Sequence, residues 1–323
     1  MRHLSKSPLA VAREALAVGE AALSRYSSPY SPKTYTQAQL FSILVVRRML
    51  QLDYRGAVEL LAEFSDLRKL LKLKKIPHFT SLCHAEHRLM RNGGFDILLE
   101  QTIQRCRCRG LIKPPAEASI DSSGMESHHV SRYFVHRKGS RQDWYRPWLK
   151  LTVVILNQLH LILAALVDSG PSNDAPQFDP AIRQAVSHLP LDVVLADSGY
   201  DAERHHALCR QELGISQTAI ALNLRGRQTV HGKYRRQMHR RFPKRRFGQR
   251  WQIESTFSQH KRVLGDALTA RTDEYRQAEC LFRVLVHNIM ILWLHLNTKV
   301  FYRAFSVPMT IRYPLSALRV FRP

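Results

Sequence analysis

Acidic residues are scarce in this chain of 323 residues. Only 26 aspartates and glutamates stand against 49 lysines and arginines, which gives a formal net charge of +23 and an isoelectric point near 10.3. This imbalance excludes an acidic or neutral surface and favours a polyanion as the partner. The apolar content of 45% excludes a disordered chain. The length predicts about two domains with room for a proper core.

Long hydrophobic runs are also absent. No stretch reaches the ~18 uninterrupted apolar residues that a membrane-spanning helix needs. The nearest approach, residues 149–167, carries Lys150 and the central polar pair Asn157 and Gln158, which predicts a β-hairpin. The first thirty residues lack a continuous apolar segment, so we expect no secretory signal. Nucleic acid is therefore favoured over a membrane, and we expect a cytoplasmic protein associated with the nucleoid.

Cysteine is rare as well, with five residues in an odd set. Cys106 and Cys108 are separated by one residue, and no second pair is found at zinc-finger spacing. We expect reduced structural thiols in place of zinc ligands. The chain also has no internal repeat and no glycine-rich phosphate loop.

One stretch, residues 246–261, has an unusual charge pattern. At about 100° per residue, a helix over this stretch places an aromatic residue, one carboxylate and two cations within one wedge of about 60°. These residues are Phe247, Arg250, Glu254 and Lys261. A carboxylate flanked by fixed cations suits a metal ion on the acid and phosphates along the helix. Taken alone, the pattern also fits a solvated Arg-Glu-Lys ladder on a surface helix.

The spacing of these four residues resembles the Tyr-x2-Arg-x3-Glu-x6-Lys signature of a large group of insertion-sequence DDE transposases. Phe247 stands where the signature has tyrosine, so any contact of the phenol hydroxyl is absent or replaced. The resemblance implies two upstream aspartates, each at the end of an apolar strand. Asp121 opens Asp-Ser-Ser-Gly, and Asp197 opens Asp-Ser-Gly-Tyr after an apolar run. Each aspartate alone would be an ordinary turn former.

The resemblance implies that Asp121, Asp197 and Glu254 are both the catalytic acids and the metal ligands. Two Mg²⁺ ions, or Mn²⁺ in their place, would stabilise the attacking and leaving oxygens during in-line attack on a phosphodiester. Asp121 would bridge both ions, while Asp197 and Glu254 would hold one each. Arg250 and Lys261 would bind phosphates of the DNA end.

A basic segment, residues 225–246, precedes this helix and adjoins the proposed acid site. We expect it to contact DNA, although a solvated arm is the alternative. With the helix residues, the expected DNA contacts are Phe247, Arg250, Lys261, Lys233, Arg235, Arg236, Lys244, Arg245 and Arg246. Trp251 could stack on a base, but a buried indole is the more frequent outcome and is expected here.

The pattern along the chain predicts an α/β protein. Residues 1–115 have helical periodicity and form either a DNA-binding domain or a plain helical support for the second domain. The sequence pattern changes at residues 113–115, Lys-Pro-Pro, which we interpret as the boundary between two domains. Residues 116–300 have the order strand, hairpin, helix, strand, helix, strand, helix, which matches a ribonuclease-H-like catalytic domain. Residues 301–323 are expected to form a C-terminal tail.

These features together predict a DNA transposase that cuts and joins the ends of an insertion sequence. Its partners would be the terminal inverted repeats and target DNA, bound by a homodimer or a larger assembly. The interval between Asp197 and Glu254 is too short for a large β-rich insertion, which indicates the shorter branch of the group. Two alternatives stay open: a metal-dependent nuclease of the same fold, and a non-enzymatic DNA-binding transposase remnant.

Overall fold

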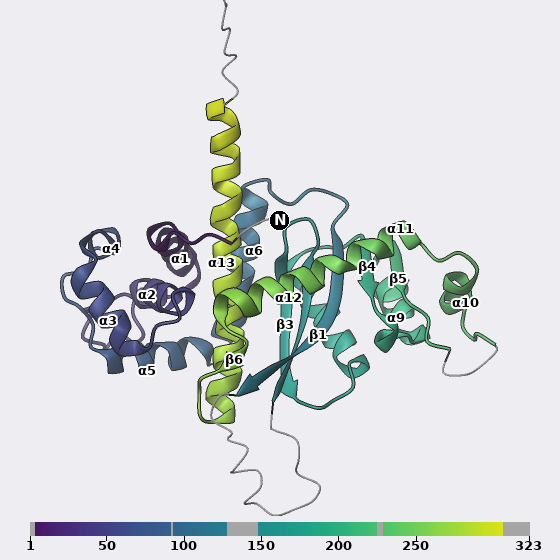
Figure 1. Cartoon of the computed structure of the whole chain (residues 1–323), viewed down its shortest axis with the longest axis horizontal. Helices are drawn as coiled ribbons and strands as arrows, with labels where there is room; N and C mark the ends of the chain where they lie inside the picture. Colours follow the sequence, from purple (N-terminus) through teal and green to yellow (C-terminus); the bar gives the residue numbers. More distant parts are fainter. Residues whose placement is uncertain (1–3, 92, 128–147, 225–228, 306–323) are drawn as a thin grey trace, which may run out of the picture.

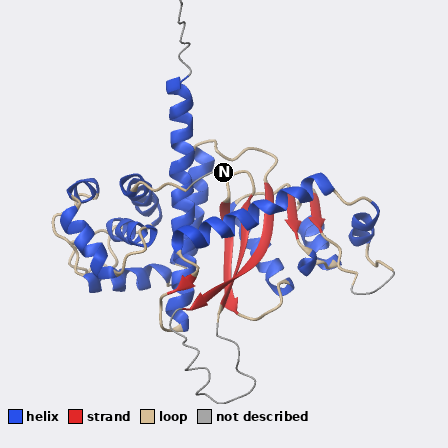
Figure 2. Ribbon diagram, viewed as in Figure 1, coloured by secondary structure: helices blue, strands red, loops and turns tan. Residues whose placement is uncertain are grey.

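A computed structural model describes residues 4–91, 93–127, 148–224 and 229–305. The basic aromatic loop at 128–147, the start of the basic segment at 225–228 and most of the expected tail, 306–323, lie outside the described residues. Figure 1 shows a helical amino-terminal region on one side of a long helix, α13, and a sheet with its own helices on the other. Figure 2 shows that the strands gather in one part of the molecule.

A mixed sheet forms the centre of the second half of the chain. The central strand, β1, pairs antiparallel with β2 and parallel with β4, and the full order is β3-β2-β1-β4-β5. A short strand, β6, pairs parallel with the end of β1. The strands are β1 (Glu117–Ser127), β2 (Leu149–Leu156), β3 (Leu161–Ser169), β4 (Val193–Ala196), β5 (Gln217–Ile220) and β6 (Ala267–Leu268). The predicted α/β class is confirmed, and the hairpin predicted at 149–167 is β2 and β3.

Helices account for the rest of the regular structure. Thr36 caps α2 through a capping box with Gln39. Gly93 precedes α6 with φ 75°, a left-handed conformation that glycine adopts without strain. The helices are α1 (Pro8–Ala22), α2 (Gln37–Met49), α3 (Tyr54–Glu63), α4 (Ser65–Leu70), α5 (Phe79–Met90), α6 (Gly94–Cys108), α8 (Phe178–His188), α9 (Glu203–Ala207), α10 (Lys233–Arg240), α11 (Lys244–Phe247), α12 (Trp251–Leu264) and α13 (Asp273–Phe305).

The core is continuous across the boundary expected near residue 115. One cluster of buried side chains includes Val11 of α1, Ile120 of β1 and Leu292 of α13. The described part of α13 packs against α6 and β3, so it joins the amino-terminal helices to the sheet. None of the five cysteines forms a disulfide. In the described ranges, no helix is both long enough and apolar enough to cross a bilayer.

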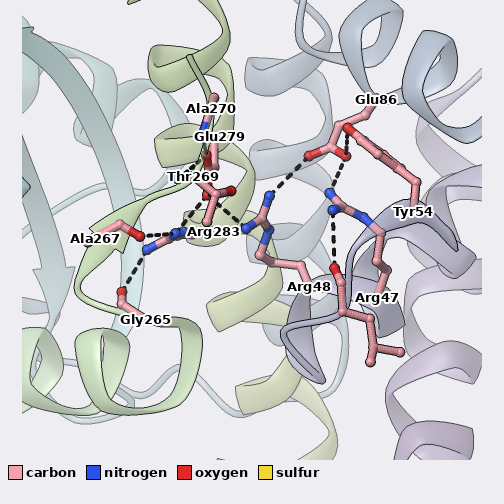
Figure 3. A network of polar contacts seen from close by, with 11 residues as sticks. Arg47, Arg48, Tyr54, Glu86, Gly265, Ala267, Thr269, Ala270, Glu279 and Arg283 are labelled. Carbon is pink, nitrogen blue, oxygen red and sulfur yellow. Dashed lines mark hydrogen bonds and ion pairs between the residues drawn. The ribbon is translucent and has the colours of Figure 1, made fainter. Parts of the chain in front are cut away.

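A buried ion-pair network fastens α13 to its neighbours (Figure 3). The Glu279 carboxylate lies 2.8 Å from a guanidinium nitrogen of Arg48 and 2.7 Å from one of Arg283. Arg283 also donates to the carbonyl oxygens of Gly265 and Ala267, each at 2.7 Å, in the segment just after α12. Glu279 therefore links α2 to the carboxyl end of α12. Burial alone would raise the pKa of Glu279, but Arg48 and Arg283 hold it below its ordinary value.

We expect Glu279→Gln to lower the free energy of unfolding by about 3 kcal/mol or more, because it leaves two buried guanidinium groups without their counter-charge. The loss should be full at neutral pH. It should shrink as the pH falls through the folded-state pKa of Glu279, where the wild-type carboxylate is protonated too. Urea unfolding followed by circular dichroism measures both effects. Glu274→Gln is the matched control on the same helix, since Glu274 is 59% exposed in its pair with Arg91 and should change stability little. Equal effects of the two changes would contradict this role of the network.

Candidate active site

The register of the sheet brings two of the predicted acids together. The parallel pairing of β1 and β4 ends at Ile120 and Ala196, and Asp121 and Asp197 are the residues that follow this last pair along the chain. Side chains alternate along a strand, so these two aspartates leave the same face of the sheet on neighbouring strands. Asp197 comes directly after the last residue of its strand, as predicted. Asp121 does not, because β1 continues to Ser127 alongside β2.

The same face of the sheet receives the segment that carries the third acid. Val193, Leu195 and Ala219 form a small apolar cluster there, and the half-buried Phe247 packs onto it. This contact docks α11 on β4 and β5. A 3₁₀ turn, Gly248–Arg250, then leads into α12. The single helix expected over residues 246–261 is therefore two helices with a tight turn between them, and Phe247 serves as the apolar anchor of the first.

Arg250 joins two of the acids directly. One guanidinium nitrogen lies 3.2 Å from Oδ2 of Asp121, and another lies 2.5 Å from Oε1 of Glu254. The side chains of Arg250 and Asp121 are only 19% and 21% exposed, while that of Glu254 is 59% exposed. Asp121 and Glu254 thus converge on one cation at the surface of the sheet, which places α12 across β1.

Burial raises the pKa of Asp121 above its ordinary value, and the neighbouring charge of Asp197 raises it further. The backbone N–H of Ser122, which donates to Oδ1 at 2.8 Å, and the guanidinium of Arg250 act in the opposite direction. The net direction is upward. Burial thus outweighs the hydrogen bond and the guanidinium, and the site disfavours the charged form of Asp121.

A fourth carboxylate lies beside Asp197. Oδ1 of Asp197 accepts a hydrogen bond from the Gly199 N–H at 2.9 Å. A methyl group at Gly199 would lie 3.1 Å from that oxygen and 3.4 Å from Oδ2 of Asp174, so Gly199 separates the two acids without filling the space between them. Asp174 forms a 2.6 Å ion pair with the buried Lys150. The sequence carries no motif around Asp174 from which this position was predictable.

Asp121, Asp197 and Glu254 are the three carboxylates that the sequence predicts as ligands of a divalent metal ion. Their carboxylates are hard oxygen donors of the kind that Mg²⁺ prefers. Asp121 and Glu254 already bind one cationic group between them, and Asp197 lies on the next strand of the same face. In the arrangement described, with Arg250 between the acids, no three His, Cys, Asp or Glu side chains among the described residues are close enough to hold a metal.

The remaining candidate residues are Trp251 and the cations that the sequence predicts as DNA contacts. Arg235 forms two 2.7 Å hydrogen bonds to the fully buried carboxylate of Asp201, which gives it an internal role. Trp251 is 53% exposed, so the expectation of a buried indole was wrong. The other basic candidates lie at least partly in solvent: Lys233, Arg236, Lys244, Arg245, Arg246 and Lys261.

Comparison with known proteins locates the site within a recognised domain. A family model described as the transposase DDE domain matches residues 113–289. No curated protein matches the chain. Among solved structures, the cryo-EM structure of the piggyBac transposase synaptic complex with hairpin DNA is 9% identical, with a TM-score of 0.44, over 93% of this chain and 79% of that one.

We expect Asp121→Asn to raise the melting temperature of the metal-free protein at pH 7. A carboxyl group with a raised folded-state pKa binds its proton more tightly in the folded protein, so its ionisation costs stability as the pH rises. The advantage of asparagine should shrink as the pH falls towards 3.8, the ordinary value. Thermal melts in a chelator across this range measure it. Asp66→Asn is the control at a 63% exposed side chain. A lower melting temperature for Asp121→Asn at pH 7 would contradict the pKa direction.

Proposed function

Because the chain belongs to the transposase DDE domain family, we propose that it cuts and joins the ends of an insertion sequence with Asp121, Asp197 and Glu254 as the catalytic acids. The proposal rests on one observation: the three acids come from a strand, the end of a second strand and a helix that lie next to one another. Asp121 and Asp197 occupy adjacent positions on one face of the sheet, and Arg250 links Asp121 to Glu254 on α12.

The strand order supports a ribonuclease-H-like assignment for this domain. Three antiparallel strands, β3-β2-β1, continue into the parallel pair β4 and β5, and helices come after β3, β4 and β5 in the chain. Between Asp197 and Glu254 the described residues contain short helices and one strand, with no β-rich insertion among them. This content supports the shorter branch of the group with the Tyr-x2-Arg-x3-Glu-x6-Lys signature.

We assign two divalent ions, Mg²⁺ or Mn²⁺, to the three acids. Such ions would stabilise both the attacking and the leaving oxygen of an in-line displacement at phosphorus. Asp121 lies between its two partners and would be shared. The upward shift of its pKa agrees with this role, because a carboxylate short of positive charge gains most from a cation.

Arg250 and Lys261 are assigned to phosphates of the element's end. In the absence of DNA, the guanidinium of Arg250 lies between Asp121 and Glu254. Cations held by the acids would repel it, and a bidentate phosphate contact beside the acids is the natural alternative for an arginine. Lys261 lies seven residues beyond Glu254 on the same helix, about 10 Å along its axis. A DNA strand that runs along α12 would meet both groups.

We also propose that the protein binds DNA as a homodimer or a larger oligomer.

We expect Glu254→Gln to separate chemistry from binding. Glutamine keeps the size of the side chain but removes the charge that holds a cation, so cleavage with Mg²⁺ should fall by about a hundredfold or more. Affinity for the terminal repeat should survive. Gel shifts and strand-cleavage assays on the same preparation measure the two properties. Cleavage at the wild-type rate by Glu254→Gln would favour the DNA-binding remnant.

Arg250→Ala should give the converse result. Loss of a charged phosphate contact should weaken end binding by about tenfold to a hundredfold, while the acids remain in place for metal-dependent nicking. Mn²⁺ affinity without DNA, measured by calorimetry, should rise because no guanidinium competes for Asp121 and Glu254. Arg262→Ala is the matched control, since Arg262 is an exposed cation on the same helix. Unchanged end binding and unchanged Mn²⁺ affinity in Arg250→Ala would contradict both roles.

A further inference from the structure

A strongly basic surface lies on α10, away from the three acids. Lys233, Arg236, Gln237, Arg240 and Arg241 line an open pocket of about 560 Å³. Lys233, Arg236, Gln237 and Arg240 are spaced along one side of α10, and Arg241 follows its last residue, while Tyr234 and Met238 are buried. The four cations are exposed, and in the described parts of the chain no carboxylate forms an ion pair with any of them. We call these five residues the α10 surface.

The α10 surface is held rigidly. The carboxylate of Glu203 accepts hydrogen bonds from the backbone N–H groups of Tyr234 at 2.9 Å and Arg235 at 3.0 Å, which fixes the start of the helix. Gly232 precedes it with φ 96°, and any side chain there would collide with Glu203. Arg235 binds the buried Asp201. Both carboxylates come within six residues after Asp197, so the start of α10 is bound to the segment that follows this predicted acid.

This surface and Lys261 lie on opposite sides of the acids. The acids lie at β1 and the end of β4, whereas α10 packs on α9 beyond the edge strand β5. From the acids, α12 runs in the other direction, to α13 and α2. Figure 1 shows this order plainly: α10 is at one end, α11 and the start of α12 are in the middle, and the end of α12 lies against α13.

A phosphodiester at the acids has DNA on both of its sides. If the element's end lies along α12, the duplex on the other side of the bond to be cut must leave towards α10. Exposed cations that no carboxylate of the described residues neutralises suit phosphates, because each contact with a phosphate releases condensed counterions. A rigid helix that presents cations at one side can track one strand of a duplex without reading its bases.

We propose that the α10 surface binds the backbone of the flanking duplex, the DNA that adjoins the element beyond the bond to be cut. This inference rests on the proposed function, since the acids define where the element ends. The enzyme then holds DNA by two separate surfaces, α12 for the element and the α10 surface for the flank. The flank contact acts before cleavage, and it is lost when the flank is released.

The test compares two duplexes that carry the element's terminal repeat. One ends at the cleavage point, and the other continues into about two helical turns of flank. Binding of both to the full-length protein is measured by fluorescence anisotropy over a range of salt. In the wild type, the flank should increase affinity and steepen the salt dependence. In Lys233→Ala/Arg236→Ala/Arg240→Ala, the flank should add nothing, and the slope with the flanked duplex should fall by up to about three units.

Two further variants make the comparison specific. Arg236→Lys/Arg240→Lys keeps the charges and should keep the affinity gained from the flank. Lys261→Ala should weaken binding of both duplexes while the gain from the flank remains. Thermal melts confirm that each variant is folded. A gain from the flank that survives in the triple alanine variant overturns the inference. The inference is also overturned if the triple alanine variant loses only the ability to capture a separate target duplex when it is bound to the duplex that ends at the cleavage point. If the wild type fails to prefer the terminal repeat over unrelated DNA, the proposed function fails, and the two failures are thereby distinguished.

Discussion

The pairing of one guanidinium with two carboxylates joins the central strand of the sheet to α12. Arg250 lies between Asp121 on the central strand and Glu254 on α12. It can do so only because both ends of that helix are fixed. At the amino end, Phe247 packs on the apolar face of β4 and β5. At the carboxyl end, Arg283 binds the carbonyl groups just after α12, and Glu279 connects Arg283 to the amino-terminal helices. The helix that carries Glu254 is thus positioned by the whole fold and not by the sheet alone.

Several of the few acidic residues lie in the interior of the protein. Several are buried partners of arginines: Glu86 binds Arg47, Glu279 binds Arg48 and Arg283, and Asp201 binds Arg235. Buried ion pairs of this kind contribute little net stability, but the loss of one partner is costly because a charge is left unpaired. Each of these carboxylates is matched by at least one arginine, so the pairs leave the positive excess of the chain, +23 in all, on its other side chains. That excess favours a polyanionic partner and fast electrostatic association.

Sequence patterns predicted the elements well where the periodicity was strong. The helical character of the first 115 residues, the hairpin of β2 and β3 and the strand that precedes Asp197 agree with expectation. The DDE transposase family is confirmed, while the group with the Tyr-x2-Arg-x3-Glu-x6-Lys signature stays a prediction. The full length of β1 was not predictable, because Asp-Ser-Ser-Gly has turn chemistry and only pairing with β2 keeps it extended. Nor was the internal role of Arg235 predictable, since its partner Asp201 lies 34 residues earlier. The grouping of Asp121, Asp197 and Glu254 as catalytic metal ligands stays a prediction, as does the separate status of residues 1–115.

In the proposed active site, these three carboxylates form one metal site from which Arg250 is displaced. Anomalous diffraction from crystals of the protein with its terminal repeat, grown in Mn²⁺, would locate the metal and the arginine together. We expect Mn²⁺ density between Asp121, Asp197 and Glu254, carboxyl carbons within about 10 Å of one another, as a two-metal site requires, and the guanidinium of Arg250 turned to a phosphate. Mn²⁺ bound only elsewhere, or Arg250 still paired with both acids at saturating Mn²⁺, would contradict this proposal.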